Sequence, residues 1–123
     1  MDQIIFSGLR SEAYIGFEQE ERSKKQLLEI DLIISLDLKK ADVLGKDDSS
    51  SLSLQIVNSI NYDFIKNDIQ IMLDSRSWIL LEELANYIAD SLSSTYPEIK
   101  AIDLTIKKFI YKDVNFVAVR VLR

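Results

Sequence analysis

Hydrophobic and polar residues alternate along three stretches of this chain. The longest runs from Leu28 to Leu38, where every second residue is Leu or Ile, and shorter ones cover Ile102 to Lys108 and Val117 to Leu122. Successive side chains of a strand point to opposite faces, so such alternation is typical of a strand with one buried face. Each stretch therefore predicts a half-buried strand of an antiparallel sheet.

Another strand is expected before these three, from Ile4 to Ile15. Gly8 lies inside it, and a glycine within a strand often marks a bulge or a bend. Gly16 and the polar residues 18–25 follow, and they are expected to connect this strand to the next one. The predicted strands thus form two pairs, separated by the middle of the sequence.

The spacing of apolar residues between the two strand pairs is helical. One stripe comprises Leu81, Leu84, Ala85, Ile88, Ala89 and Leu92. Pro97 lies just beyond it, where the helix is expected to have ended. An earlier helix is expected to follow Asn61 as its N-cap, with Asp63 in its first turn. The buried stripe of this earlier helix comprises Ile65, Ile69 and Met72.

The predicted order is strand-strand-helix-helix-strand-strand, in a single domain that spans residues 1–123. A chain of this length can bury one core. Strand pairs that flank a helix pair favour an α+β fold, with two helices on one face of a four-stranded antiparallel sheet. The polar, serine-rich segment from Lys46 to Gln55 is expected to form a surface loop.

The chain is acidic, with a net charge of -5 and a pI of about 4.7. Nucleic acids and anionic membranes bind basic surfaces, so neither is expected as a partner. No apolar run approaches the roughly 20 residues that cross a bilayer. The N-terminus, at residues 1–3, has no basic segment that leads into an apolar stretch, so no secretory signal is expected. We therefore expect a cytoplasmic protein.

The sequence contains neither cysteine nor histidine. Zinc sites of the usual kinds, and catalytic relays built on these residues, are therefore excluded. Chemistry on this chain must use Lys, Tyr, Asp, Glu, backbone groups or water. A magnesium site made only of carboxylates stays open, although no cluster of acidic residues indicates one.

Two charged residues stand beside apolar ones. Lys108 continues the apolar phase of its strand, and burial disfavours the charged form of a lysine, which suits a proton-transfer role. Alternatively, its stem is buried while the ammonium reaches water. Glu82 borders Leu81 on the helix, and a carboxylate beside an apolar wall can bind the N–H edge of a flat heterocycle. Alternatively, Glu82 is a solvated first-turn residue favoured by the helix dipole.

Two further residues are candidates for the same site. Tyr62 follows the expected N-cap, and its phenol could transfer a proton at the rim of a pocket. Simple packing is the alternative interpretation of Tyr62. Glu21 lies in the acidic run of residues 18–21, and such runs usually form a hydrated loop.

Four segments, in order, resemble the dihydroneopterin aldolase family, and together they cover nearly the whole chain. The opening segment has Gly8-Leu9-Arg10, Ile15-Gly16, Glu21 and Gln26. The three others are Asn61-Tyr62, Leu80-Leu81-Glu82-Glu83-Leu84-Ala85 and Leu104-Thr105-Ile106-Lys107-Lys108. The resemblance implies a tunnelling fold (T-fold), whose element order agrees with the one predicted above. It also implies a homo-oligomer, in which rings of four subunits stack into an octamer with the active sites between subunits.

The resemblance further implies a role for each candidate residue. Glu82, with Leu81 and backbone amides beside it, would bind the pterin ring. Lys108 would act with an ordered water as general acid and base, and Glu21 would position or deprotonate the side-chain hydroxyl. Tyr62 of the adjacent subunit would assist protonation of the enol intermediate. Retro-aldol cleavage of 7,8-dihydroneopterin would then give 6-hydroxymethyl-7,8-dihydropterin and glycolaldehyde without metal or cofactor.

The sequence departs from the family pattern in three places. Phe109 follows Lys108 where aldolases commonly have Pro or a polar residue, the loop from Phe109 to Asn115 lacks the Pro and Gly residues of many aldolases, and Ser49 to Gln55 resembles an insertion. A lysine followed by an apolar residue also occurs in dihydroneopterin triphosphate epimerase, the alternative activity within the family. An epimerase would need basic residues at the pocket mouth, for which Lys107 and Lys112 are candidates. A scaffold that binds pterin without catalysis is the third interpretation.

Overall fold

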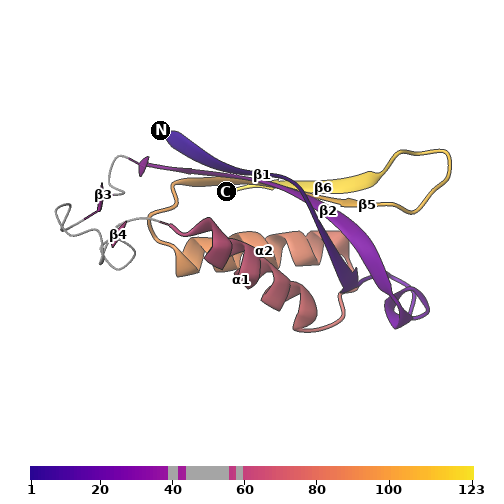
Figure 1. Ribbon diagram of the computed structural model, residues 1–123. Coiled ribbons are helices and arrows are strands. Elements are labelled where there is room, and N and C mark those ends of the chain that lie inside the picture. The colour runs from indigo at the N-terminus through magenta and orange to yellow at the C-terminus, as the bar shows by residue number, and fades with distance from the viewer. Residues whose placement is uncertain (39–41, 44–55, 58–59) are drawn as a thin grey trace.

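A computed structural model describes residues 1–38, 42–43, 56–57 and 60–123. Its main sheet is antiparallel, with strands in the spatial order β1-β2-β5-β6 (Figure 1). The bounds of these strands are Asp2–Tyr14 for β1, Lys25–Leu36 for β2, Ala101–Lys108 for β5 and Val117–Leu122 for β6. The predicted four-stranded antiparallel sheet is therefore confirmed.

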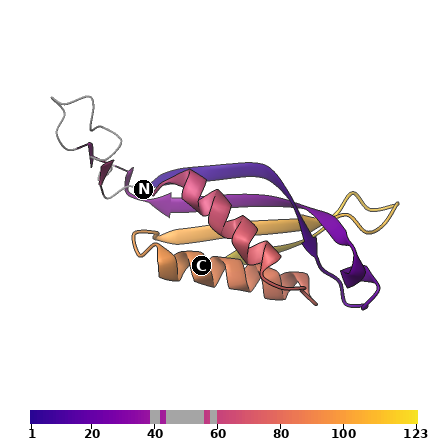
Figure 2. The same cartoon turned by 60° about the horizontal axis from the view of Figure 1, so that its bottom comes forward.

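Both helices, α1 (Tyr62–Asp74) and α2 (Leu81–Thr95), lie on one face of this sheet (Figures 1 and 2). The predicted N-cap is confirmed, because the Asn61 side chain accepts a hydrogen bond from the Asp63 N–H at 2.8 Å. The apolar side chains of both helices pack against every second residue of β2 and β5. The predicted α+β order of strand-strand-helix-helix-strand-strand is therefore confirmed as well.

Some element boundaries differ from the predicted ones. Strand β2 begins at Lys25 and ends at Leu36, so it is displaced toward the N-terminus relative to the alternating stretch. A short 3-10 helix, η1 (Glu21–Ser23), and a small pair of strands, β3 (Asp42–Val43) and β4 (Ile56–Val57), were not predicted. The expected loop from Lys46 to Gln55, with its apparent insertion, lies outside the described residues.

The bulge expected at Gly8 is present. The pairing of β1 with β2 shifts its register between Phe6 and Leu9, and Gly8 has a φ of 68°. Glycine adopts this left-handed conformation without the steric cost that a Cβ brings. The Gly8 N–H donates a hydrogen bond to Asp31 Oδ1 at 2.7 Å, so a side chain of β2 supports the bulge in β1.

The two faces of the sheet differ in chemistry. The helix-covered face is mostly apolar; the buried polar residues of the described chain are Ser11 on β1 and the charged Lys108 on β5. The opposite face carries ion pairs between strands: Lys107 Nζ lies 3.1 Å from Glu29 Oε2 and 3.0 Å from Asp31 Oδ2. A charged side chain on the helix-covered face is therefore an exception that calls for a partner.

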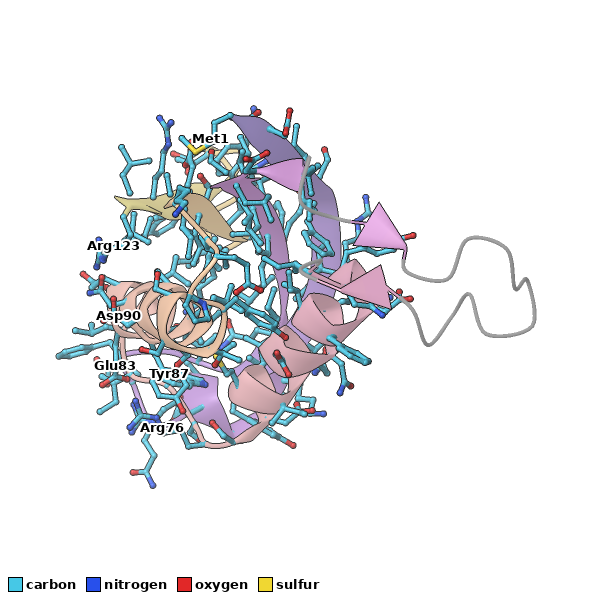
Figure 3. The ribbon with its side chains drawn as sticks, turned by 90° about the vertical axis from the view of Figure 1, so that its left-hand side faces the viewer. Met1, Arg76, Glu83, Tyr87, Asp90 and Arg123 are labelled. Carbon is cyan, nitrogen blue, oxygen red and sulfur yellow. The ribbon has the colours of Figure 1, made fainter. Side chains whose placement is uncertain are left out.

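Two residues, Arg123 and Tyr96, make polar contacts that join elements around the helices. Arg123, just past β6, lies 3.4 Å from Asp90 on α2 and also donates to Asn86 (Figure 3). The Tyr96 hydroxyl, at the end of α2, donates to Asp68 Oδ2 on α1 at 2.5 Å. Neither helix of the described chain is both long and apolar enough to cross a membrane.

Candidate active site

Lys108 is the last residue of β5 and points to the helix-covered face. The predicted burial is confirmed, because only 6% of the residue is exposed. The Lys108 ammonium does not extend into water as an unpaired charge. It donates to Glu21 Oε2 at 3.1 Å. Removing water from an ammonium is costly, so this ion pair is what allows a lysine at a buried position.

Glu21, the partner of Lys108, comes from a distant part of the chain. Its carboxylate is shared between two donors, because Oε1 accepts the Glu18 N–H at 3.2 Å while Oε2 accepts from Lys108. The Glu18 N–H first, and then Lys108, lower the pKa of Glu21 below its ordinary value of 4.5. Glu21 is therefore held as a carboxylate beside a buried ammonium, an arrangement that places a proton acceptor next to a proton donor.

The end of β1 is bonded to the segment that precedes α2. The Trp78 N–H donates to Tyr14 O at 2.8 Å, and the Gly16 N–H donates to Trp78 O at 2.9 Å. Trp78 itself is fully buried, and the Arg76 guanidinium lies 4.1 Å above its ring, with Tyr87 beside it (Figure 3). These bonds fix the start of α2 against the turn that carries Glu21.

Glu82 and Leu81 stand in the first turn of α2. Leu81 is half-buried against the core, whereas Glu82 is exposed and makes no hydrogen bond or ion pair within the described part of the chain. No side chain caps this helix start, which leaves the amides of its first turn available as donors. The start of α2, η1 and the end of β5 lie at the same end of the sheet (Figure 1). Lys108, Glu21 and Glu82 therefore share one corner of the molecule.

Tyr62 is not part of that corner. It is the first residue of α1 and is 60% exposed. The start of α1 lies at the opposite end of the helix layer from η1 (Figures 1 and 2), and a helix of 13 residues is about 20 Å long. One chain thus brings together three of the four candidate polar residues and leaves Tyr62 apart.

Two hollows on the described surface lie away from this corner. A hollow of about 550 Å³ lies between β1 and α1, and neither Lys108 nor Glu82 lines it. Phe109, the departure from the family pattern, lines a different hollow of about 340 Å³ with Arg10, Leu27 and Glu29. Because Glu29 faces away from the helices, Phe109 does not belong to the wall around Lys108 on the helix-covered side.

Two residues around Glu21 have structural roles that the residue pattern did not indicate. Arg22 donates to the carbonyls of Gly16 and Phe17 at 2.7 and 2.9 Å. Gln26 donates to Ile15 O and to Glu21 O, the latter at 2.8 Å. Gln26 belongs to the family-like opening segment, whereas Arg22 carries no sequence signal because its acceptors are backbone atoms of an irregular turn.

The sequence of this chain is similar to those of known dihydroneopterin aldolases. The family model for dihydroneopterin aldolase matches residues 4–121. A dihydroneopterin aldolase from Streptococcus pyogenes is 32% identical over 108 residues, which cover 88% of this chain and 83% of that protein.

Two solved structures share the fold at lower identity. Escherichia coli dihydroneopterin aldolase in complex with neopterin superposes with a TM-score of 0.82 and 20% identity, over 100% of this chain and 99% of that chain. A dihydroneopterin aldolase from Burkholderia thailendensis bound to guanine gives 0.74 and 20%, over 99% and 89%. Because the family model covers residues 4–121 and the Streptococcus pyogenes protein is 32% identical over 88% of this chain, the chain belongs to the dihydroneopterin aldolase family.

Proposed function

We propose that this protein is a dihydroneopterin aldolase of folate biosynthesis, acting in the cytoplasm without metal or cofactor. The observation that carries the proposal is the ion pair of buried Lys108 with Glu21, at the same end of the sheet as the exposed, unpaired Glu82. An acid, a base and a carboxylate for binding are the three groups that cleavage of a dihydropterin side chain requires.

In this proposal Glu82 binds the pterin through the adjacent N–H groups of its amino-pyrimidinone edge. Leu81 and the first-turn amides of α2 support the ring. Guanine and neopterin, which are bound to the Burkholderia and Escherichia coli proteins, share that edge. A carboxylate that accepts two N–H bonds is charge-assisted and specific for such an edge.

The reaction then follows from the Lys108 and Glu21 pair. Glu21 takes the proton of a side-chain hydroxyl as the neighbouring carbon–carbon bond breaks, and glycolaldehyde leaves. The electron pair moves into the dihydropterin ring, where a ring nitrogen receives a proton from Lys108 through an ordered water. The remaining enol carbon then receives the proton that Glu21 took, assisted by Tyr62 of an adjacent subunit, while the ring nitrogen returns its proton to Lys108 through the water, which gives 6-hydroxymethyl-7,8-dihydropterin. The ring is the electron sink, so neither a Schiff base nor a metal is needed.

We also propose that the working enzyme is a ring of four subunits, stacked into an octamer, with sites between neighbours. Strands β1 and β6 are both edge strands with unpaired backbone groups, and closure of a ring would pair them. Tyr62 is exposed and remote from Lys108 in its own chain, so only another copy can bring it to the cleft. Assembly would also supply the wall that the open corner lacks.

The alternative of an epimerase acting on a triphosphate is less well supported. Hydrogen bonds to Asp31 and Glu29 raise the pKa of Lys107 and engage its ammonium on the far face of the sheet. Lys107 is thus unsuited to bind a phosphate at the mouth of the site. Lys112, on the exposed loop after β5, is the other basic candidate.

Incubation with 7,8-dihydroneopterin tests the proposal. We expect release of glycolaldehyde and 6-hydroxymethyl-7,8-dihydropterin, with little activity on the triphosphate. Accumulation of the epimer 7,8-dihydromonapterin as the main product would instead indicate an epimerase. Pterin binding without turnover would indicate a non-catalytic scaffold.

A further inference from the structure

The turn that carries Glu21 has weak support of its own. It is a 3-10 helix of three residues, preceded by exposed Glu18, Gln19 and Glu20. Hydrogen bonds in 3-10 turns are poorly aligned, and the carboxylates of this acidic run repel one another. Keeping Glu21 at 3.1 Å from Lys108 therefore requires contacts from outside the turn.

Arg22 supplies such a contact from the residue next to Glu21. Its Nη1 donates to Gly16 O at 2.7 Å and to Phe17 O at 2.9 Å, so it joins η1 to the end of β1. A guanidinium holds its donors in a rigid plane, and two short bonds to successive carbonyls fix the position of the turn. The charge of Arg22 also opposes the repulsion within the acidic run.

Gly16 contacts both Arg22 and Glu21, so it connects Arg22 to the ion pair of Glu21 and Lys108. A Cβ built on Gly16 would lie 2.2 Å from Glu21 Cβ, so the Glu21 side chain rests directly on the Gly16 backbone. The Gly16 N–H is held by Trp78 O on one side, and its carbonyl is held by Arg22 on the other. Movement of the Gly16 carbonyl would therefore displace the surface on which Glu21 packs.

We propose that Arg22 is a positioning residue, which keeps the Glu21 carboxylate against Lys108 by holding the carbonyls of Gly16 and Phe17. The inference rests on the proposed aldolase function and adds a residue to it. Arg22 acts through Glu21 and does not contact the reacting atoms. A displacement of about 1 Å in such a pair can lower the rate on the order of 100-fold.

Replacement of Arg22 by methionine is the first test. We expect kcat on 7,8-dihydroneopterin to fall about 10- to 100-fold, with KM little changed because Glu82 and Leu81 are untouched. Arg22→Lys should recover part of the rate, and added guanidinium ion should partly rescue Arg22→Ala. Gln26 still ties Ile15 O to Glu21 O in these variants, so we expect the segment to stay folded while the Gly16 and Phe17 carbonyls lose their donor. Lys24→Met is the control, since it removes a cation from the same segment.

A carbon-13 NMR titration measures the pKa of the Glu21 carboxyl, which should not change in Arg22→Lys if Arg22 only stabilises the fold. The pKa of Glu21, lowered by the Glu18 N–H, by Lys108 and by the charge of Arg22, should rise in Arg22→Met, rise less but measurably in Arg22→Lys, which keeps the charge, and stay low in Lys24→Met. A wild-type kcat in Arg22→Met, or a lower unfolding temperature with an unchanged Glu21 titration, would overturn the inference. If the wild-type protein leaves 7,8-dihydroneopterin uncleaved, the proposed function fails, while the titration still decides the role of Arg22.

Discussion

The two halves of the candidate site are built in opposite ways. In the proton-transfer half, buried Lys108 forms an ion pair with the partly exposed Glu21 of the same chain. The binding half is open: Glu82 is exposed, and Tyr62 is 60% exposed at the far end of the helix layer. In the proposed assembly, the groups that need a defined geometry are held by the fold, whereas the groups that would receive a ligand are left for a neighbouring subunit to enclose. Substitutions in the two halves should therefore have different kinetic signatures.

The largest effect is expected from Lys108→Met. Loss of the general acid should lower kcat by roughly 10³-fold while pterin binding persists. Lys107→Met is the matched control, because Lys107 is the neighbouring lysine on the opposite face of the sheet. Steady-state kinetics and fluorescence titration with neopterin measure the two quantities. Full activity of Lys108→Met would remove Lys108 from the chemistry.

Gly16→Ala should have the next largest effect. A Cβ at 2.2 Å from Glu21 Cβ forces the turn apart, and overpacking of this kind costs roughly 1–3 kcal/mol of unfolding free energy. The catalytic rate should fall with it, because Glu21 leaves Lys108. Gly8→Ala is the control: its φ of 68° makes alanine destabilising, yet activity should remain. Urea unfolding and turnover together separate the two glycines, and equal loss of activity in both would contradict the comparison.

Glu82→Gln should act mainly on binding. A hydrogen bond to a charged group contributes about 1.5–3 kcal/mol, so KM should rise roughly 10- to 100-fold with a smaller change in kcat. Glu83→Gln, the next residue on α2, serves as the control, since Glu83 instead accepts the Ile79 N–H at 3.4 Å. A fall in kcat at constant KM would place Glu82 in the chemical step and erase the contrast between the halves.

The smallest effect is expected from Tyr96→Phe, which should lower the free energy of unfolding without changing activity. Burial, and then the hydrogen bond to Asp68, raise the pKa of Tyr96 to about 12. Because this value exceeds the ordinary 10.0, the contribution is fully present below pH 10 and is lost as the pH rises through about 12. Removing the bond should cost on the order of 1 kcal/mol at neutral pH. Tyrosinate absorbance checks the titration; an ordinary value for Tyr96 would contradict the contact.

The regular parts of the fold could be predicted from residue periodicity. Alternation from Leu28 onward defines the buried face of β2, and the same phase places Lys108 among buried residues of β5. Asn61 identified the start of α1 because capping depends on a local side chain. Boundaries were less accurate: Lys25 begins β2 because its partner Tyr14 continues the pairing, which no local pattern of the polar residues 18–25 indicates.

The irregular parts of the site could not be predicted from pattern. Glu21 and Lys108 are separated by 87 positions, and the acidic run around Glu21 is typical of a hydrated loop. The bonds of Trp78 to Tyr14 and Gly16 are backbone contacts, which leave no trace in residue type. The roles of Glu21, Glu82, Leu81, Lys108 and Tyr62 in catalysis and binding stay predictions drawn from family resemblance and supported by this geometry.

Subunit complementation tests most directly whether one cleft is built from two chains. Lys108→Met and Tyr62→Phe proteins, each nearly inactive alone, are unfolded together in equal amounts and reassembled. If Lys108 and Tyr62 meet across an interface, random mixing gives intact clefts at about a quarter of the sites, with activity in proportion. Activity no greater than that of the two separately reassembled variants would contradict a site shared between neighbours.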